Sequence, residues 1–147
     1  NKETGKITDG AETTFRCFSA SQEATFPNVR RSRWENFDTL KTFGADFSAM
    51  ADFIGANLPK QKIVRIHVAG DFYSQAYFDA WLEVAKRNPA KTFYAYTKSL
   101  GFWIQRKAEI PANFKLNASR GGRNDELIAT HSLKFAEVIF TEAEAAD

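Results

Sequence analysis

Four short segments rich in strand-forming residues recur along the chain, and a segment with helical spacing follows each of the first three. The segments end in small or polar residues, as in Ile63-Val-Arg-Ile-His-Val-Ala-Gly-Asp71. This alternation predicts parallel strands joined by helical crossovers, because parallel neighbours need long right-handed connections. We expect four parallel neighbours in sequential order, near residues 63–69, 92–98, 114–119 and 136–141.

The remaining segments indicate what surrounds this sheet. Residues 1–25 have no sustained apolar period and predict irregular structure. The apolar spacing from Trp34 to Leu58 predicts two helices or one kinked helix, with Asp46 as an N-cap. The clearest amphipathic helix follows the first strand and ends at Asn88-Pro89, and Ser74 is its expected N-cap. We expect its apolar face to be buried against the sheet, namely Tyr77, Phe78, Trp81 and Leu82.

The strands carry polar residues on one face. Alternation along a strand places Arg65 and His67 opposite Val64, and it places Asn117 and Ser119 together on the third strand. A sheet covered by helices on both sides would be apolar on both faces, so a polar face favours an arc of a barrel that lines a cavity. The predicted fold is therefore α/β, a βαβαβαβ series whose four-stranded parallel sheet forms a partial TIM-like barrel. We expect a single domain over 1–147, with its core in 26–147.

Strand parity and strand-end position together select a candidate site at the carboxyl edge of the sheet, where α/β proteins place their functional groups. The expected proton-handling residues are His67 and Asp71. The expected ligand-binding residues are Arg65, Tyr96, Lys98, Asn117, Ser119 and Arg120. Cations, a carboxylate and neutral donors in one place suit an anionic or zwitterionic small ligand. Each residue also has a structural explanation, since His67 could be a core histidine and Asp71 a helix cap. Lys98 and Arg120 could be solvated strand ends.

Two local patterns add further hypotheses. Arg120-Gly-Gly-Arg123 is a candidate anion-binding loop. Arg30, Arg31 and Arg33 form a basic cluster that is either a solvated surface or a nucleic-acid contact.

Composition limits the class of protein. The 147 residues carry a net charge of +2, which is too mild to indicate nucleic acid by itself. No apolar run approaches the roughly 20 residues that cross a bilayer, so we expect no membrane partner, and a cytoplasmic protein is the default. Cys17 is the single cysteine, which excludes a multi-cysteine metal site made by this chain alone.

Several motifs together resemble a known family. They are Arg16–Glu23, Phe26–Arg30, Arg65–Ser74, Thr92–Ser99 and Asn117–Gly122. Over residues from about 12 to the end, the chain resembles the phage and plasmid proteins called gene product eighty-eight. More distantly, it is similar to phage radical S-adenosylmethionine proteins, which are partial barrels that carry an iron-sulfur cluster.

The resemblance implies a longer protein. Family members have a cysteine-containing segment before the position of Cys17 and an acidic, histidine-containing segment after the position of Ala146. We therefore expect this chain to be a fragment or a short version. An iron-sulfur cluster needs three cysteines, so Cys17 is a ligand only with cysteines from outside this chain.

Three functions remain open from the sequence. The first is an enzyme domain of mobile-element origin that uses S-adenosylmethionine or another small anionic cofactor. The second is a non-catalytic accessory protein that binds nucleic acid or a host protein through Arg30, Arg31, Arg33 and nearby aromatic residues. The third is a folded fragment whose function needs the missing flanks.

Overall fold

The computed structural model describes residues 1–8, 18–139 and 141–142, so Cys17 lies outside the described residues. The chain forms two compact units, Asn1–Ala45 and Asp46–Asp147. The sheet belongs wholly to the second unit, and a single domain over the whole chain stays a prediction. No helix in the described part of the chain is long and apolar enough to span a membrane.

The first unit is built on two helices, α1 at Phe18–Thr25 and α2 at Pro27–Lys41. Pro27 occupies the start of α2. Proline is tolerated there because the first N–H groups of a helix have no partner within the helix. The expectation of irregular structure through residue 25 is therefore wrong for residues 18–25. No residue of α1 is buried, so this helix has no apolar period for the sequence to reveal.

A turn separates α2 from α3, which spans Phe47–Ala56. Gly44 has a φ of +56°, a conformation that other residues rarely adopt, and it ends the first helical run. Asp46 then caps α3, because its carboxylate accepts a hydrogen bond of 2.9 Å from the backbone N–H of Ala49. The predicted N-cap is confirmed, and of the two alternatives left open by the sequence the structure has two separate helices.

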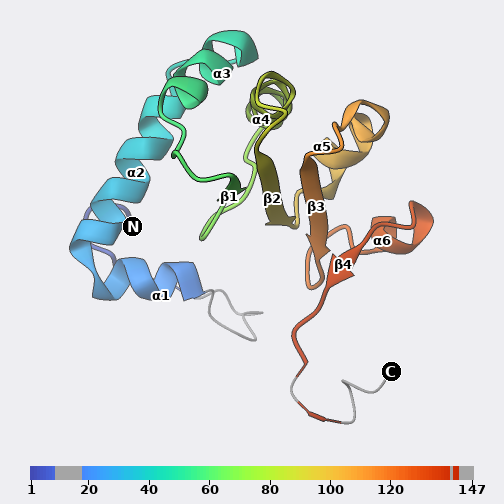
Figure 1. Ribbon diagram of the computed structural model, residues 1–147. Helices are drawn as coiled ribbons and strands as arrows, with labels where there is room; N and C mark the ends of the chain where they lie inside the picture. The colour runs from blue at the N-terminus through green and yellow to red at the C-terminus, as the bar shows by residue number, and fades with distance from the viewer. Residues whose placement is uncertain (9–17, 140, 143–147) are drawn as a thin grey trace. The chain divides into compact units, whose positions relative to one another are not determined.

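The sheet contains four strands in the order β1-β2-β3-β4, and all neighbours are parallel. The strands are Ile63–Arg65, Thr92–Thr97, Phe114–Ser119 and Phe135–Ala136. The predicted α/β fold with sequential parallel strands is confirmed (Figure 1). β1 is shorter than expected, and β4 overlaps its predicted range of 136–141 only at Ala136. Residues 137–139 are not strand, and residue 140 lies outside the described residues. Closure of the sheet into part of a barrel stays a prediction.

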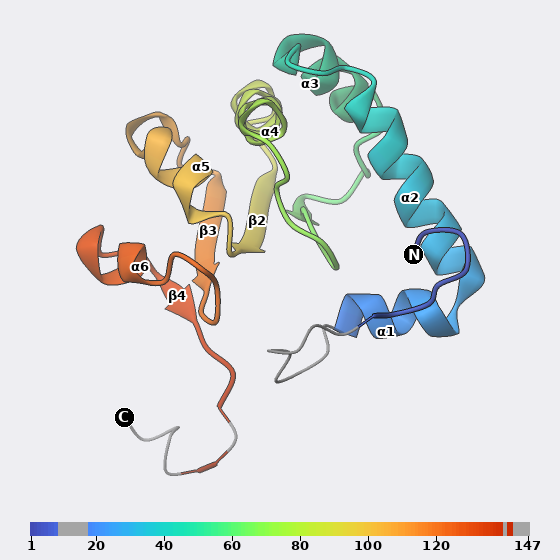
Figure 2. The same ribbon diagram turned by 180° about the vertical axis from the view of Figure 1, so that it is seen from behind.

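Helical segments make the crossovers between these strands. α4 spans Gln75–Arg87, α5 spans Leu100–Gln105 and is followed by the 3₁₀ helix η1 at Lys107–Glu109, and α6 spans Glu126–Thr130. Ser74 caps α4 as predicted, since its hydroxyl accepts from the N–H of Tyr77. Figures 1 and 2 show α4 and α5 along one side of the sheet.

The core lies between α4 and one face of the sheet. Phe78 of α4 is fully buried, and its ring lies 6.1 Å from that of Phe114 in β3. Phe93 is also fully buried and contacts Trp81 at 6.1 Å between ring centroids. Trp81 itself is only partly buried, which corrects the expectation that it belongs to the fully buried face of this helix.

Candidate functional site

The face of the sheet opposite α4 is polar, as strand parity predicted. Val64 is buried whereas Arg65 is exposed, and Leu116 and Ala118 are buried whereas Asn117 is only partly covered. The register places residues of adjacent strands side by side on this face, Arg65 with Tyr94, Tyr94 with Lys115, and Tyr96 with Asn117. Ser119 lies on the same face, at the end of β3.

Arg65 is held in place on this polar face. Its Nε donates a hydrogen bond of 2.9 Å to the carbonyl of His67, and its guanidinium carbon lies 5.5 Å from the centre of the Tyr96 ring. A cation over an aromatic face is attracted by the ring quadrupole. Arg65 and Tyr96 therefore form one preorganised pair.

The side chain of His67 does not share the polar face with that of Arg65. β1 ends at Arg65, so the alternation that predicted a shared face does not extend to His67. Its Nε2 lies 3.0 Å from the hydroxyl of Tyr77 in α4, and its ring packs at 4.7 Å from that of Phe72. This placement on the helical side corrects the sequence-based assignment.

Burial determines the protonation of this histidine. It lowers the pKa of His67 to about 4. The negative charge of Asp71 opposes this shift, because it favours the charged imidazolium and so raises the pKa. Burial also raises the pKa of Tyr77 to about 12. The pair is therefore neutral at pH 7, and His67 Nδ1 is buried with no hydrogen-bond partner among the described residues.

Asp71 connects the segment that follows β1 to the end of β2. Its carboxylate accepts hydrogen bonds from the hydroxyl of Thr97 at 2.6 Å, the backbone N–H of Lys98 at 2.7 Å and the N–H of Phe72 at 2.8 Å. Thr97 is almost fully buried. Asp71 therefore fixes the backbone where β2 ends, and it does not cap α4, which Ser74 caps.

Lys98 meets the segment Arg120-Gly-Gly-Arg123, here called the glycine loop, directly after β2 and β3. The Lys98 ammonium donates to the carbonyl of Arg120 at 2.8 Å, and a Cβ on Gly121 would come within 3.0 Å of the Lys98 Nζ. Gly121 has a φ of +94°, a conformation that favours glycine at this position. The close approach brings the Lys98 ammonium against the loop backbone.

The glycine loop holds an anion, and that anion is a side chain of this protein. The N–H groups of Gly121 and Gly122 donate to the two carboxylate oxygens of Asp125 at 2.7 and 2.9 Å. The hydrogen bond from Gly121 lowers the pKa of Asp125, aided by the bond from Gly122 and by the charges of Lys98 and Arg120. The predicted anion-binding character of the loop is therefore used internally.

An open depression of about 580 Å³ lies beside this loop. Residues from the segments after β2 and β3 line it, namely Lys98, Ser99, Gly101, Phe102, Gly121, Gly122, Arg123 and Asn124. Of the predicted site residues, only Lys98 lines it. Arg120 points elsewhere, because it pairs with Glu137 at 2.8 Å and lies over the Phe135 ring at 4.5 Å.

The predicted site is thus distributed over three places. Arg65, Tyr96, Asn117 and Ser119 share the polar face, Asp71 and Lys98 meet at the carboxyl edge, and His67 lies under α4. Sequence reasoning missed Tyr77 and Asp125 as partners. Asp125 shortly after a Gly-Gly pair is a local signal, whereas nothing near His67 in sequence indicates its contact with Tyr77.

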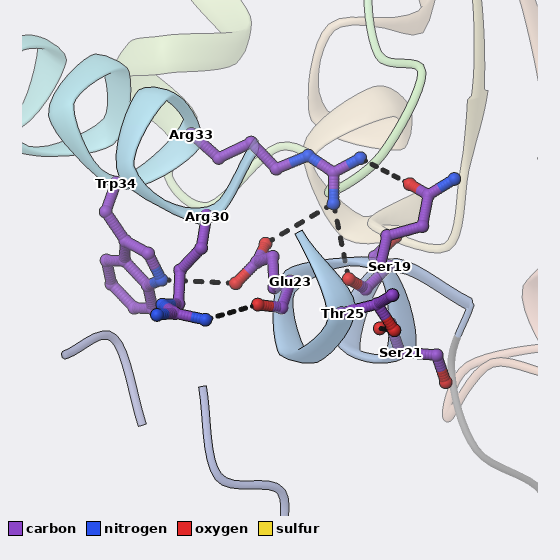
Figure 3. Close-up of polar contacts among 8 residues, drawn as sticks. Ser19, Ser21, Glu23, Thr25, Arg30, Arg33 and Trp34 are labelled. Atoms are coloured by element: carbon purple, nitrogen blue, oxygen red, sulfur yellow. Dashed lines mark hydrogen bonds and ion pairs between the residues drawn. The ribbon is translucent and has the colours of Figure 1, made fainter. Parts of the chain in front are cut away.

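Arg33, which belongs to the basic cluster of α2, binds to residues of α1 (Figure 3). Its guanidinium donates to the carbonyl of Ser19 at 3.2 Å and to the side chain of Gln22 at 2.6 Å, and it forms an ion pair with Glu23 at 3.5 Å. These contacts hold the two helices of the first unit together.

Arg30 contacts the same helix. It donates to the backbone carbonyl of Glu23. Arg31 is exposed and donates to Asn28 within α2. Arg30 and Arg33 are thus both bound to α1, so the cluster is not a free basic patch.

Metal ligands do not gather in the described part of the chain. No group of three His, Cys, Asp or Glu residues there could hold a metal ion. Cys17, the one predicted cluster ligand, lies outside the described residues.

Comparison with known proteins gives a family. A family model described as Gene product 88 matches residues 8–147. The chain belongs to this family. No curated protein and no solved structure matches it. The Gene product 88 match agrees with the resemblance found in the sequence motifs. The description of this family names no activity.

Proposed function

We propose that this Gene product 88 protein is the ligand-binding α/β domain of an enzyme, and that it holds a small anionic or zwitterionic ligand at the carboxyl edge of its sheet. The observation that carries the proposal is the depression between the segments after β2 and β3. Ligands of parallel α/β sheets bind outside the carboxyl ends of adjacent strands, which is where these segments lie.

The charges around the depression favour an anion. Lys98 and Arg123 are exposed cations on its lining, and the nearby carboxylates of Asp125 and Asp71 are already bound by backbone N–H groups. Asn124 supplies an amide, and Phe102 supplies an apolar ring for the rest of the ligand. Asp71 acts as a positioning residue, because it binds the backbone N–H of Lys98.

S-adenosylmethionine is the candidate cofactor. Its carboxylate would pair with the positive charge of Lys98 or Arg123, and its adenine ring would pack against the ring of Phe102. An iron-sulfur cluster does not fit the chain by itself, because one cysteine stands where three are needed. We therefore assign no step to a cluster.

Binding of nucleic acid or a host protein through Arg30, Arg31 and Arg33 has weaker support. Arg30 and Arg33 hold α1, and charges that are already bound within the chain contribute less to a partner. No observation on this cluster favours a ligand.

Isothermal titration with S-adenosylmethionine and with inorganic pyrophosphate tests the proposal. Lys98→Met keeps the side-chain stem but removes the ammonium, so it should weaken binding about ten- to hundredfold. Lys86→Met is the matched control, since Lys86 is an exposed lysine in the last turn of α4. The proposal fails if neither probe binds, or if Lys98→Met and Lys86→Met bind alike.

A further inference from the structure

We propose that the polar face of the sheet binds single-stranded nucleic acid by stacking bases on Tyr94 and Tyr96. We call this surface the tyrosine face, and it consists of Arg65, Tyr94, Tyr96, Lys115, Asn117 and Ser119. It lies on the flat of the sheet, whereas the proposed ligand depression lies at the carboxyl edge. The two proposals therefore rest on different residues.

Tyr96 presents an exposed aromatic ring on this face, and Tyr94 beside it is half-buried. Tyr96 is 41% exposed, a high value for a residue of a central strand. The centres of the Tyr94 and Tyr96 rings are 6.4 Å apart, and the rings meet edge to face. Tyr96 is therefore an exposed ring on which a base can stack, and Tyr94 borders it on the same face.

Arg65 strengthens the stacking surface. Its guanidinium is fixed over the Tyr96 ring and by its bond to the His67 carbonyl, so it is ordered before any ligand arrives. Bases stack on planar guanidinium groups as well as on aromatic rings. Arg65 and Tyr96 together therefore offer one base a preformed platform.

The charge of the tyrosine face matches a phosphate backbone. Arg65 and Lys115 are exposed cations on either side of Tyr94 in the cross-strand row, and none of the six residues is acidic. A surface that combined tyrosines with carboxylates would repel a nucleic acid. Asn117 beside Tyr96 adds an amide that donates and accepts hydrogen bonds at a base edge.

A single strand is favoured over a duplex because stacking requires open base faces. Duplex bases are already stacked on one another, and a flat sheet presents neither a helix nor a two-stranded ribbon to a groove. The proposal therefore commits to a single strand, and RNA and DNA are distinguished by the experiment.

Fluorescence anisotropy with labelled oligouridine and oligodeoxythymidine of twelve nucleotides tests the inference on the full chain. We expect binding that weakens with salt, and Tyr96→Leu should lower the affinity roughly five- to hundredfold while Tyr96→Phe retains it. Lys115→Gln should reduce the slope of log affinity against log salt by about 0.7. A preference between the two strands identifies the nucleic acid that the face accepts.

The matched control is Phe47→Leu, because Phe47 is an exposed aromatic residue of α3 in the same unit. It should bind as the unaltered protein does. The inference is overturned if neither strand binds at low salt, if a duplex of equal length binds as tightly, or if Tyr96→Leu and Tyr96→Phe bind alike. It is also overturned if Arg31→Ala removes binding while Tyr96→Leu does not, since the contact would then lie on α2.

Discussion

At the scale of single residues, His67 gives the protein a specific pH dependence. Its pKa falls from 6.5 to about 4 on folding because burial disfavours the imidazolium. Below pH 6.5 the unfolded chain therefore binds a proton that the folded chain does not. The free energy of unfolding should fall by about 3 kcal/mol as the pH drops from about 6.5 to 4, and the full stability should return above 6.5.

Urea denaturation at pH 7 and at pH 4.5 measures this dependence. His67→Gln should lose most of the difference between the two pH values, since it removes the titrating group. His131→Gln leaves His67 in place and should behave as the unaltered protein does. Equal pH dependence in both variants would show that His67 is not held neutral by burial.

Asp71 is a structural residue as well as a positioning one. Asp71→Ala removes the acceptor of three hydrogen bonds and leaves the buried Thr97 hydroxyl without that partner, so it should cost about 2–3 kcal/mol of unfolding free energy. Asp71→Asn keeps one acceptor and one donor and should cost less. The denaturant midpoints of the two variants and the unaltered protein test this ranking. An unchanged midpoint for Asp71→Ala would refute the structural role.

At the scale of elements, α4 holds the core through Phe78 more than through Trp81. Phe78 is fully buried, and Phe78→Ala should cost about 3–5 kcal/mol. Trp81 keeps part of its surface in water, so Trp81→Ala should cost less, about 2 kcal/mol. Thermal and urea unfolding of the two variants give the ranking, and a larger loss for Trp81→Ala would contradict the observed burial.

α1 depends on the arginines of α2. Arg33→Ala removes contacts to Ser19, Gln22 and Glu23, so the amides of α1 should exchange hydrogen faster while those of β2 keep their rates. Arg31→Ala is the control, because Arg31 contacts Asn28 within its own helix. Hydrogen exchange read by mass spectrometry tests this. Unchanged exchange in α1 would mean that these contacts do not hold it.

At the scale of the whole molecule, the sequence predicted what local patterns determine. Strand alternation with helices gave the parallel order, and capping residues gave the starts of α3 and α4. Alternation within β3 gave its polar face. Each of these follows from periods of two or 3.6 residues, which are visible over a few positions.

The sequence-based predictions failed where tertiary contacts determine the local structure. α1 is held by side chains of another helix, so its own residues show no apolar period. His67 followed the strand pattern in sequence, but β1 ends two residues before it and the chain turns toward Tyr77. The glycine loop was expected to bind an anionic ligand, whereas its N–H groups bind the Asp125 carboxylate of the chain itself. None of these partners could be identified by spacing alone.

The most direct test of the proposed function is a two-dimensional ¹H–¹⁵N spectrum of the full chain titrated with S-adenosylmethionine, then with pyrophosphate. A ligand in the depression should shift the amides of its lining, above all those of Lys98, Gly101 and Gly122. Amides of the exposed end of α4 should stay in place, and Lys98→Met should remove the saturable change. Spectra in which the lining amides do not move with either probe at millimolar concentration would contradict a ligand site at the carboxyl edge of this sheet.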